Sequence, residues 1–449
     1  MHATASPRVD SMLGTLSASI AKGRLPLWIY NDAEVFRLEM ERIFARNWVF
    51  VAHESEIPRS GDYVSRPIGQ DPFIIVRGED GKIRALFDSC RHRGARICPS
   101  DQGNAQTFFC PYHGWSYTTA GALEAVPAKT TAYQHLNLAD WGLLQAPRVE
   151  IYRGLVFAAL TEDVPALTDY LGDYRWYLDT HLALTEGGLE VVGTPHRWHI
   201  DADWKSGAEN FSGDSYHTQT LHQSIMRIGL APKAAAGASG GVNDVHVTEC
   251  SGHATSIRRT DPGTAHFWGY PKDVAALFRQ GELSAAQFEL AQRSVVHTGT
   301  VFPNLSLIHI GGTDSADKPN SAYFSLRQWQ PRAPGQLEAW SWVLVPKDAS
   351  AEFKARSYKV AVANFSPSGN FEQDDSVTWS GVARSAQSVF ARNSDMHLNY
   401  QMGLPEMSTA RLMKDWPGPG AVYDTNLEEG VQRTFFNHWC RAMSAGSRT

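Results

Sequence analysis

The sequence of 449 residues has few of the features that mark several specialised classes of protein. Its five cysteines are too few and too scattered for the disulfide framework of a small secreted protein: Cys90, Cys98, Cys110, Cys250 and Cys440. No uninterrupted apolar run reaches about 18 residues, so no transmembrane helix is predicted. The N-terminus lacks a basic segment followed by an apolar block, which a secretory signal requires. We therefore expect a cytoplasmic protein with no membrane partner.

An excess of positive charge is also missing. The 41 Lys and Arg residues are outnumbered by 47 Asp and Glu residues, which gives a formal net charge of −6. Proteins that bind nucleic acids use surplus positive charge to displace the counterions of the phosphates, so no nucleic-acid partner is expected. No Gly-x-Gly-x-x-Gly follows a predicted strand, so the chain is expected to use NAD(P)H only indirectly, through partner proteins.

Aromatic and apolar residues, in contrast, are plentiful. Hydrophobic residues make up 43% of the chain, which includes 14 Trp, 15 Tyr and 20 Phe. This length is enough for two to three domains with buried cores. So many aromatic side chains suit large apolar pockets, although they serve equally well in large cores.

Hydrophobic periodicity divides the chain into three parts. In residues 1–47, Asp32 can cap a helix in which Phe36, Met40 and Phe44 share one face. Residues 48–165 have the short apolar runs and turn signals of a small all-β domain. Within it, hairpins are predicted for 73–76 with 83–87 and for 149–152 with 155–160.

The remaining residues, 166–449, mix helical and strand patterns. Helices are predicted for 169–182, 208–224 and 351–365, and two long strands, 323–330 and 337–345, flank a turn rich in Pro and Gly. We therefore predict an α+β fold in which the segment 1–47 packs on this larger domain.

Two short motifs in the β domain offer metal ligands. Cys90-x-His92 and Cys110-x-x-His113 each end an apolar strand and each supply one thiolate and one imidazole. A structural zinc site uses the same residue types, but zinc fingers usually pair Cys with Cys and His with His. One Cys and one His from each loop suit a Rieske [2Fe–2S] cluster, and Trp115 could shield it from water.

The segments 90–94 and 110–115, with 17 residues between His92 and Cys110, resemble the Rieske motif of bacterial aromatic-ring-hydroxylating oxygenases, in the large alpha subunit. Rieske proteins of respiratory complexes carry a disulfide between the two loops, but the matching positions here are Ala95 and Tyr112. Cys98 has no partner in this motif and is interpreted as a small buried hydrophobic residue.

A second motif lies at 204–222 and contains His217 and His222. Non-haem Fe(II) oxygenases bind iron through two His and one carboxylate and leave other positions open. Five residues along a regular helix separate side chains by about 140°, so both His reach one metal only if the helix is distorted or ends between them. On spacing alone, two unrelated His would be favoured. The whole segment, however, resembles the catalytic signature of the same family. The resemblance implies that His217 and His222 bind iron, that Asp214 links the two metal centres and that Asn210 lies close to the iron.

The third iron ligand has to come from elsewhere in the chain. The segment 369–375 resembles the downstream acidic motif of the family, in which the second Asp of the pair is the ligand. The resemblance therefore implies Asp375 as the ligand, with Asp374 and Glu372 in supporting roles. Taken alone, such an acidic cluster is more often a solvated face or a helix cap.

The resemblance implies a complete catalytic system. Its cofactors are one [2Fe–2S] Rieske cluster and one mononuclear Fe(II), with O2 as co-substrate. Its catalytic domain has an antiparallel sheet covered by helices, in a helix-grip-like arrangement. The chain would form a homotrimeric ring, in which His113 of one chain hydrogen-bonds Asp214 of the next. A small beta subunit would complete an α3β3 hexamer, and a ferredoxin or a reductase would donate the electrons.

The implied reaction is the insertion of both oxygen atoms into an aromatic ring to give a cis-dihydrodiol, although some relatives hydroxylate once. Similarity to the family suggests the following pocket residues: Phe211, Thr218, Phe365 and Phe371, with His297 and Leu307 as further candidates. Apolar linings favour a mono- or polycyclic aromatic hydrocarbon. A phthalate- or salicylate-like carboxylate is the alternative and would need a cation in the pocket, such as Arg227, Arg258 or Arg293.

Two functions of other classes remain open at this point. A Rieske electron carrier without the mononuclear iron would hold two irons per chain, where the oxygenase would hold about three. A zinc-stabilised binding protein would be colourless. Iron content and colour therefore separate the three hypotheses.

Overall fold

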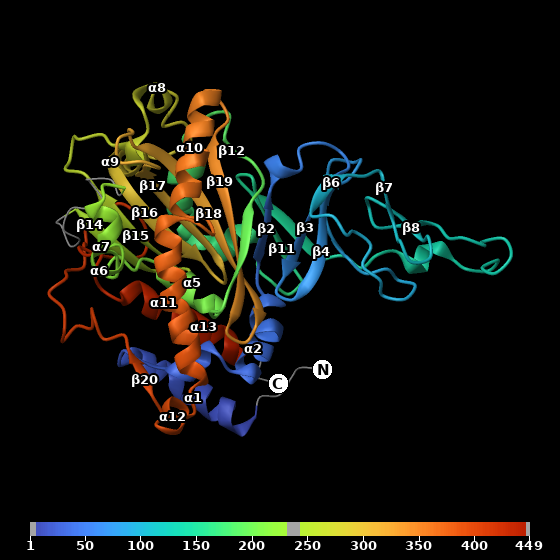
Figure 1. Ribbon diagram of the computed structural model, residues 1–449, viewed down its shortest axis with the longest axis horizontal. Helices are drawn as coiled ribbons and strands as arrows, with labels where there is room; N and C mark the ends of the chain where they lie inside the picture. Colours follow the sequence, from blue (N-terminus) through green and yellow to red (C-terminus); the bar gives the residue numbers. More distant parts are fainter. Residues whose placement is uncertain (1–5, 231–242, 446–449) are drawn as a thin grey trace. The chain divides into compact units, whose positions relative to one another are not determined.

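The computed structural model describes residues 6–230 and 243–445. It contains two compact units, Phe44–Leu167 and a larger one made of Met1–Ile43 with Thr168–Thr449 (Figure 1). No helix within the described ranges is long and apolar enough to cross a membrane.

The smaller unit is built from short antiparallel strands. They form sheets in the orders β10-β11-β2, β5-β4-β3-β6 and β7-β8-β9. The bounds are β2 Val49–His53, β3 Asp62–Ile68, β4 Asp71–Arg77, β5 Ile83–Phe87, β6 Gln102–Asn104, β7 Thr107–Phe109, β8 Ser116–Thr118, β9 Leu123–Ala125, β10 Arg148–Tyr152 and β11 Leu155–Ala159. Short 3₁₀ turns lie at η3 Glu54–Glu56 and η4 Leu138–Trp141.

Both predicted hairpins of this unit are confirmed. Strand β4 pairs with β5 so that Phe73 lies opposite Phe87, and β10 pairs with β11 across the turn at Gly154. Ile74, Val76 and Leu86 of β4 and β5 belong to one apolar cluster, which also contains Cys90 and Cys110. The two cysteines of the metal motif are therefore part of the core of this unit.

The larger unit is organised around a long antiparallel sheet. Its strands follow the order β12-β19-β18-β17-β16-β15-β14-β21, and β13 also pairs with β19. The bounds are β12 Leu189–Val191, β13 His196–Ile200, β14 Asp244–Cys250, β15 His253–Arg259, β16 Ser294–Val301, β17 Leu305–Gly312, β18 Ser321–Ala333, β19 Gln336–Pro346 and β21 Ala421–Tyr423. A separate pair joins β1 Arg24–Pro26 to β20 His397–Asn399. The predicted long hairpin is confirmed as β18 and β19, whose turn contains Gly335.

Helices surround this sheet (Figure 1). The bounds are α1 Pro7–Ala21, α2 Ala33–Glu39, α3 Leu167–Leu171, α4 Arg175–Leu182, α5 Trp204–Phe211, α6 Thr218–Leu221, α7 Gln223–Arg227, α8 Lys272–Ala275, α9 Ala285–Arg293, α10 Ala351–Asn364, α11 Asn370–Gln387, α12 Val389–Asn393 and α13 Gly430–Ala445. Shorter turns lie at η1 Leu27–Tyr30, η2 Met40–Phe44, η5 Gly172–Tyr174 and η6 Phe267–Gly269. Helix α5 packs on β16, β17 and β18, helix α10 packs on β17, β18 and β19, and α13 packs on β14 and β15. The antiparallel sheet covered by helices confirms the predicted α+β class.

The N-terminal segment is tied into the larger unit by a buried polar cluster. The Glu39 carboxylate on α2 accepts hydrogen bonds from Lys205 Nζ at 2.6 Å, Trp204 Nε1 at 2.9 Å and Trp439 Nε1 at 2.8 Å. Glu39 and Lys205 are both fully buried, and Asp203 lies 2.8 Å from the same ammonium group. Each buried charge thus has a partner of opposite sign, which offsets the cost of removing it from water.

Candidate metal centres and substrate cavity

The two motif loops of the smaller unit have the same backbone turn. In the first loop, Gly94 N–H donates to the Cys90 carbonyl at 2.8 Å, and in the second, Gly114 N–H donates to the Cys110 carbonyl at 3.0 Å. The two glycines have φ values of +74° and +73°, which residues with a Cβ rarely adopt. Two equivalent turns therefore present one cysteine and one histidine each.

The side chains of these loops converge. The rings of His92 and His113 lie 4.5 Å apart, and Trp115 stacks on His92 at 5.0 Å. Cys90 and Cys110 are buried. Burial and the nearby His113 lower the pKa of His92, and its buried Nδ1 has no partner among the described residues. Two thiols and two imidazoles, one imidazole with an unpaired nitrogen, are a donor set that fits a Rieske cluster.

Tyr117 is a part of this site that the sequence analysis missed. Its hydroxyl oxygen accepts the Arg91 N–H at 3.1 Å and lies 3.2 Å from Cys90 Sγ. Because that oxygen is already an acceptor, its own hydrogen is available to the sulfur. A sequence signal existed, because Tyr117 follows Trp115 by two residues, the spacing at which side chains share one face of a strand. Both side chains are buried.

The second motif lies on an interrupted helix. A continuous helix was predicted over 208–224, but the chain forms α5, a loop that contains Gly213, and then the short helices α6 and α7. A Cβ at Gly213, whose φ is +146°, would lie 2.7 Å from Ser256 Cβ, so this turn passes too close to β15 for any other residue. His217 and His222 flank α6 at its two ends. The condition stated above for both imidazoles to reach one point is met, because the helix ends between them.

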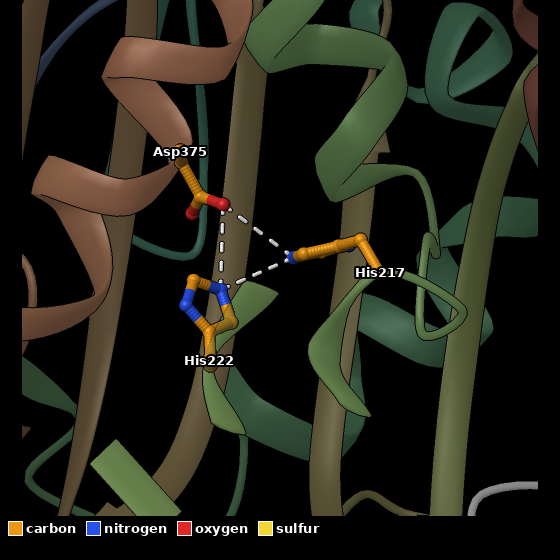
Figure 2. A group of neighbouring side chains, drawn as sticks. All are labelled: His217, His222 and Asp375. Carbon is orange, nitrogen blue, oxygen red and sulfur yellow. Dashed lines mark hydrogen bonds and ion pairs between the residues drawn. The ribbon is translucent and has the colours of Figure 1, made fainter. Parts of the chain in front are cut away.

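The two imidazoles meet a carboxylate from α11 (Figure 2). His217 Nε2 lies 3.2 Å from His222 Nε2, and Asp375 Oδ1 lies 3.5 Å and 3.3 Å from these two nitrogens. A point equidistant from the three atoms lies about 2 Å from each, the length of a metal–imidazole bond. Asp375 Oδ1 is buried and has no hydrogen-bond partner in the described part of the chain. These three residues could hold a metal ion and leave one side of it open.

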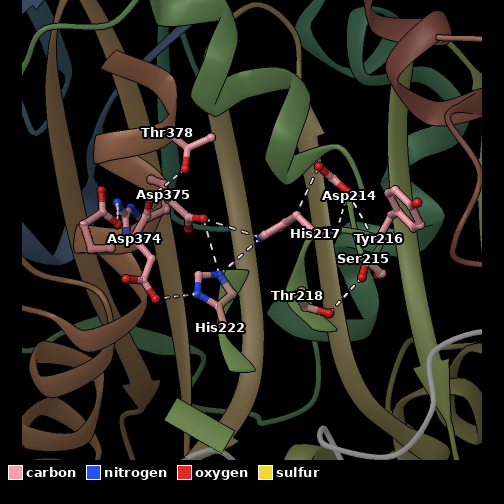
Figure 3. A network of polar contacts seen from close by, with 11 residues as sticks. Asp214, Ser215, Tyr216, His217, Thr218, His222, Asp374, Asp375 and Thr378 are labelled. Atoms are coloured by element: carbon pink, nitrogen blue, oxygen red, sulfur yellow. Dashed lines mark hydrogen bonds and ion pairs between the residues drawn. The ribbon is translucent and has the colours of Figure 1, made fainter. Parts of the chain in front are cut away.

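The Nδ1 atom of each imidazole lies close to a further carboxylate (Figure 3). His217 Nδ1 lies 3.2 Å from Asp214 Oδ2, and His222 Nδ1 lies 3.4 Å from Asp374 Oδ2. Burial alone would lower the pKa of His217, but the hydrogen bond to Asp214 and its charge outweigh burial and raise that pKa to about 9. A carboxylate in this position orients the ligand ring and increases its basicity.

The first turn of α11 is anchored to the sheet by a buried ion pair. Arg327 on β18 lies 2.6 Å from Glu372, and the two side chains are 0% and 1% exposed. The guanidinium also lies 5.5 Å from the ring centroids of Phe211 and Phe365. Glu372 precedes Asp375 by one helical turn, so this pair fixes the part of α11 that carries the carboxylate.

A cavity of about 110 Å³ opens at the side chains of His217, His222 and Asp375. Four of the predicted pocket residues line it, namely Phe211, Thr218, Phe365 and Phe371, and so does Asn210. The phenyl rings of Phe365 and Phe371 stack at 5.4 Å, and Phe371 lies 4.9 Å from the ring of His222. A cavity of about 150 Å³ binds benzene in another protein, so this space is on the scale of a single aromatic ring.

His297 and Leu307 do not line this cavity. Successive side chains of a strand point to opposite faces of the sheet, and β16 and β17 place the neighbouring residues on the cavity side. Of the three arginines considered as partners of a substrate carboxylate, Arg258 lines the cavity, whereas Arg227 and Arg293 do not. The lining residues that the sequence analysis missed are Met226, Ser256, Val296, Thr298, Ile308, Ile310 and Asn426, with Ser215. His297 instead packs 4.2 Å from the ring of His181, which lies on α4.

Comparisons with known proteins match the two parts of the chain that carry these residues. Residues 47–146 match the Rieske [2Fe-2S] domain, and residues 167–445 match the catalytic domain of the ring hydroxylating alpha subunit. The Rieske match decides between zinc and an iron–sulfur cluster in favour of the cluster.

Individual relatives cover nearly the whole chain. The biphenyl dioxygenase alpha subunit of Paraburkholderia xenovorans is 36% identical over 449 residues, which cover 95% of this chain and 92% of that protein. The alpha subunit of N,N-dimethyl phenylurea N-demethylase of Sphingobium sp. is 34% identical over 451 residues, which cover 100% and 97%. A crystal structure of naphthalene 1,2-dioxygenase from Rhodococcus sp., bound to indole, matches with a TM-score of 0.92 at 40% identity, over 98% of this chain and 99% of that chain.

Proposed function

The chain belongs to the ring-hydroxylating alpha subunits, and from this premise we propose that it is the terminal oxygenase that converts an aromatic hydrocarbon, mono- or polycyclic, into a cis-dihydrodiol. Members of this family carry a Rieske [2Fe–2S] cluster and a mononuclear iron and use O2. The observation that carries the proposal is the convergence of His217, His222 and Asp375 beneath a cavity lined by phenyl rings.

In the proposed assignment, Cys90, His92, Cys110 and His113 hold the cluster. His217, His222 and Asp375 hold the iron. When bound, the cluster supplies electrons one at a time, and the ferrous ion binds and activates O2 beside the substrate. The overall balance is one aromatic ring, one O2, two electrons and two protons to one dihydrodiol.

The protein residues orient the reactants. Phe211, Phe365 and Phe371 offer flat apolar contacts that place a ring beside the open side of the metal site and exclude water. Asp214 keeps the His217 ring in the orientation that directs Nε2 toward Asp375. Asn210, at the end of α5, accepts the Asp214 N–H with its carbonyl at 2.8 Å and so fixes the start of this loop.

The electrons come from partner proteins. We assign the partner as a ferredoxin with its reductase, or a single reductase. A ring of three copies is proposed, in which His113 of one chain hydrogen-bonds Asp214 of the next, and a small beta subunit would complete an α3β3 assembly. Support comes from relatives named as alpha subunits, which implies further subunits in those proteins.

The test is turnover under 18O2 with naphthalene or biphenyl, a reductase, a ferredoxin and NADH. The proposal predicts a cis-dihydrodiol that carries two 18O atoms, and an Asp375→Ala variant that forms none. A protein loaded with cluster and iron that consumes electrons but places no oxygen in either ring would contradict the proposal.

A second candidate is the insertion of a single oxygen atom, for example in N-demethylation. It is favoured by the 34% identity to the N-demethylase alpha subunit over the full chain. An N-methyl arene added as a third substrate separates the two, because N-demethylation inserts one oxygen atom into the methyl group, which leaves as formaldehyde, and reduces the other to water, so the aromatic product carries no 18O.

A further inference from the structure

The sheet side of the cavity changes from apolar to polar across three strands. Cavity-facing residues of neighbouring strands lie opposite one another in two rows, which are Ile308, Thr298 and Ser256 in the first and Ile310, Val296 and Arg258 in the second. Adjacent strands lie about 4.8 Å apart, so the polar end at β15 is roughly 10 Å from the apolar end at β17.

Ser256 and Thr298 form a cross-strand pair in the first row, which we call the hydroxyl pair. Neither hydroxyl has a hydrogen-bond partner within residues 6–230 and 243–445, and both residues line the cavity. Other hydroxyls nearby are engaged, since Thr218 donates to the Ser215 carbonyl at 2.8 Å and Thr255 donates to the Thr298 carbonyl at 2.6 Å. A hydroxyl without a protein partner can donate to an acceptor on a ligand, and such a hydrogen bond adds to the binding free energy.

The second row ends in a cation whose charge is already balanced. Arg258 is the sole Lys or Arg among the described residues that line the cavity. Its Nε lies 3.3 Å from Asp244 Oδ2, and the two side chains are only 13% and 4% exposed. The cavity also contains the carboxylates of Asp214 and Asp375. An aromatic carboxylate at this end of the cavity would therefore meet a cation that is already paired with its own acid.

The hydroxyl pair lies beside the loop that joins α5 to α6. A Cβ at Gly213 would lie 2.7 Å from Ser256 Cβ, and Gly213 directly precedes Asp214. The phenyl rings of Phe365 and Phe371 lie on the side of His222. A ring that rests on Ile308, Val296 and these phenyl groups would direct a substituent toward β15.

We propose that the hydroxyl pair recognises a neutral, hydrogen-bond-accepting substituent on the aromatic substrate, such as a carbonyl oxygen. This inference rests on the proposed function and narrows it. The preferred substrate would be a single aromatic ring that carries an uncharged polar group, which would bind more tightly than a bare hydrocarbon of the same size or an aromatic acid.

The experiment measures equilibrium binding to the loaded protein without O2, using three probes. Acetophenone carries the carbonyl, α-methylstyrene replaces it by a methylene group of similar shape, and benzoate carries a charge. The variants are Thr298→Val, which keeps the shape and removes the hydroxyl, Thr298→Ser, which keeps the hydroxyl, and Ser256→Ala.

We expect Thr298→Val to weaken acetophenone binding about tenfold and to leave α-methylstyrene binding unchanged, because only the carbonyl loses a donor. Thr298→Ser should restore most of the acetophenone affinity, and Ser256→Ala should act in the same direction as Thr298→Val. Benzoate should bind more weakly than acetophenone in every variant.

Equal effects of Thr298→Val on acetophenone and α-methylstyrene would overturn the inference, as would benzoate binding more tightly than acetophenone. The proposed function can fail separately. If the selective loss of acetophenone affinity is found but the loaded protein oxidises neither neutral probe, the recognition stands and the oxygenase reaction does not.

Discussion

The hydroxyl of Tyr117 is the residue-scale feature most directly aimed at the cluster. It lies 3.2 Å from Cys90 Sγ, and a hydrogen bond to a ligand sulfur stabilises the additional negative charge of the reduced cluster. One such bond is worth about 1 kcal/mol, equivalent to about 40 mV for a one-electron couple. We predict that Tyr117→Phe lowers the reduction potential by about this amount, measured by redox titration of the visible spectrum. An unchanged potential would show that the hydroxyl does not donate to the sulfur.

Asp214 acts at the same scale on the other site. Its carboxylate orients the His217 ring, and loss of such a partner typically costs 10- to 100-fold in activity or metal affinity. We predict that Asp214→Ala retains the cluster and the iron but turns over at least about tenfold more slowly, checked by iron analysis and product formation on one sample. Full turnover with both metals present would show that the reaction does not depend on Asp214.

At the scale of elements, the buried Glu39–Lys205 pair joins α2 to α5. Loss of Lys205 leaves two buried carboxyl groups, Glu39 and Asp203, without a cation, and an unpaired buried charge costs about 3–5 kcal/mol, whereas loss of Glu39 leaves Lys205 paired with Asp203. We predict that Lys205→Met lowers the free energy of unfolding more than Glu39→Leu does. Denaturant unfolding measures both, and equal losses in the two variants would contradict the prediction.

The sequence predicted the hairpins β4–β5, β10–β11 and β18–β19, because two apolar runs that flank a turn are a local signal, but most of the other strands were not predicted. The apolar run from Phe73 to Val76 and the turn at Gly81 required no distant information. Helix α1 was missed although Ser6 caps it, Pro7 begins it, and Val9, Leu13, Leu16 and Ile20 are buried. The first residues of the chain are polar, so the helical spacing of these four apolar residues was overlooked. It is recognisable in a window of eleven or more residues.

Other features of the site could not follow from local patterns. The break between α5 and α6 depends on the close approach of β15 to Gly213, a contact between residues more than 40 positions apart. The choice of Val296 and Thr298 over His297 for the cavity depends on which face of β16 is covered by α5. The pairing of Arg327 with Glu372 likewise joins a strand to a helix 45 residues away. The residue types of the motifs were enough to predict the chemistry of the two sites. Which neighbouring side chains face these sites depends on tertiary packing.

For the whole molecule, buried neutral histidines make stability depend on pH. Burial lowers the pKa of His253 to about 4 and that of His297 to about 3, below the value of about 6.5 in an unfolded chain. Between about pH 6.5 and pH 4 the unfolded chain therefore binds protons that the folded protein does not. The free energy of unfolding should fall with decreasing pH, by about 1.4 kcal/mol per unit for each histidine, and be fully present above pH 6.5.

The measurement is denaturant unfolding at pH 7.5 and pH 5.0. We predict that His297→Phe reduces the loss between the two pH values, because His297 has no hydrogen-bond partner in the described part of the chain. The control is His199→Gln, whose side chain is 72% exposed and should leave the loss unchanged. Equal pH dependence in His297→Phe and the unmodified protein would contradict the prediction.

The central claim for the whole molecule is that one chain holds a two-iron cluster and, separately, a mononuclear iron bound by His217, His222 and Asp375. The most direct measurement is iron per chain in the unmodified protein and in Asp375→Ala, together with the visible spectrum of the cluster. We predict about three irons per chain in the unmodified protein and about two in Asp375→Ala, with the same cluster spectrum in both. Three irons in both proteins, or two in both, would contradict it.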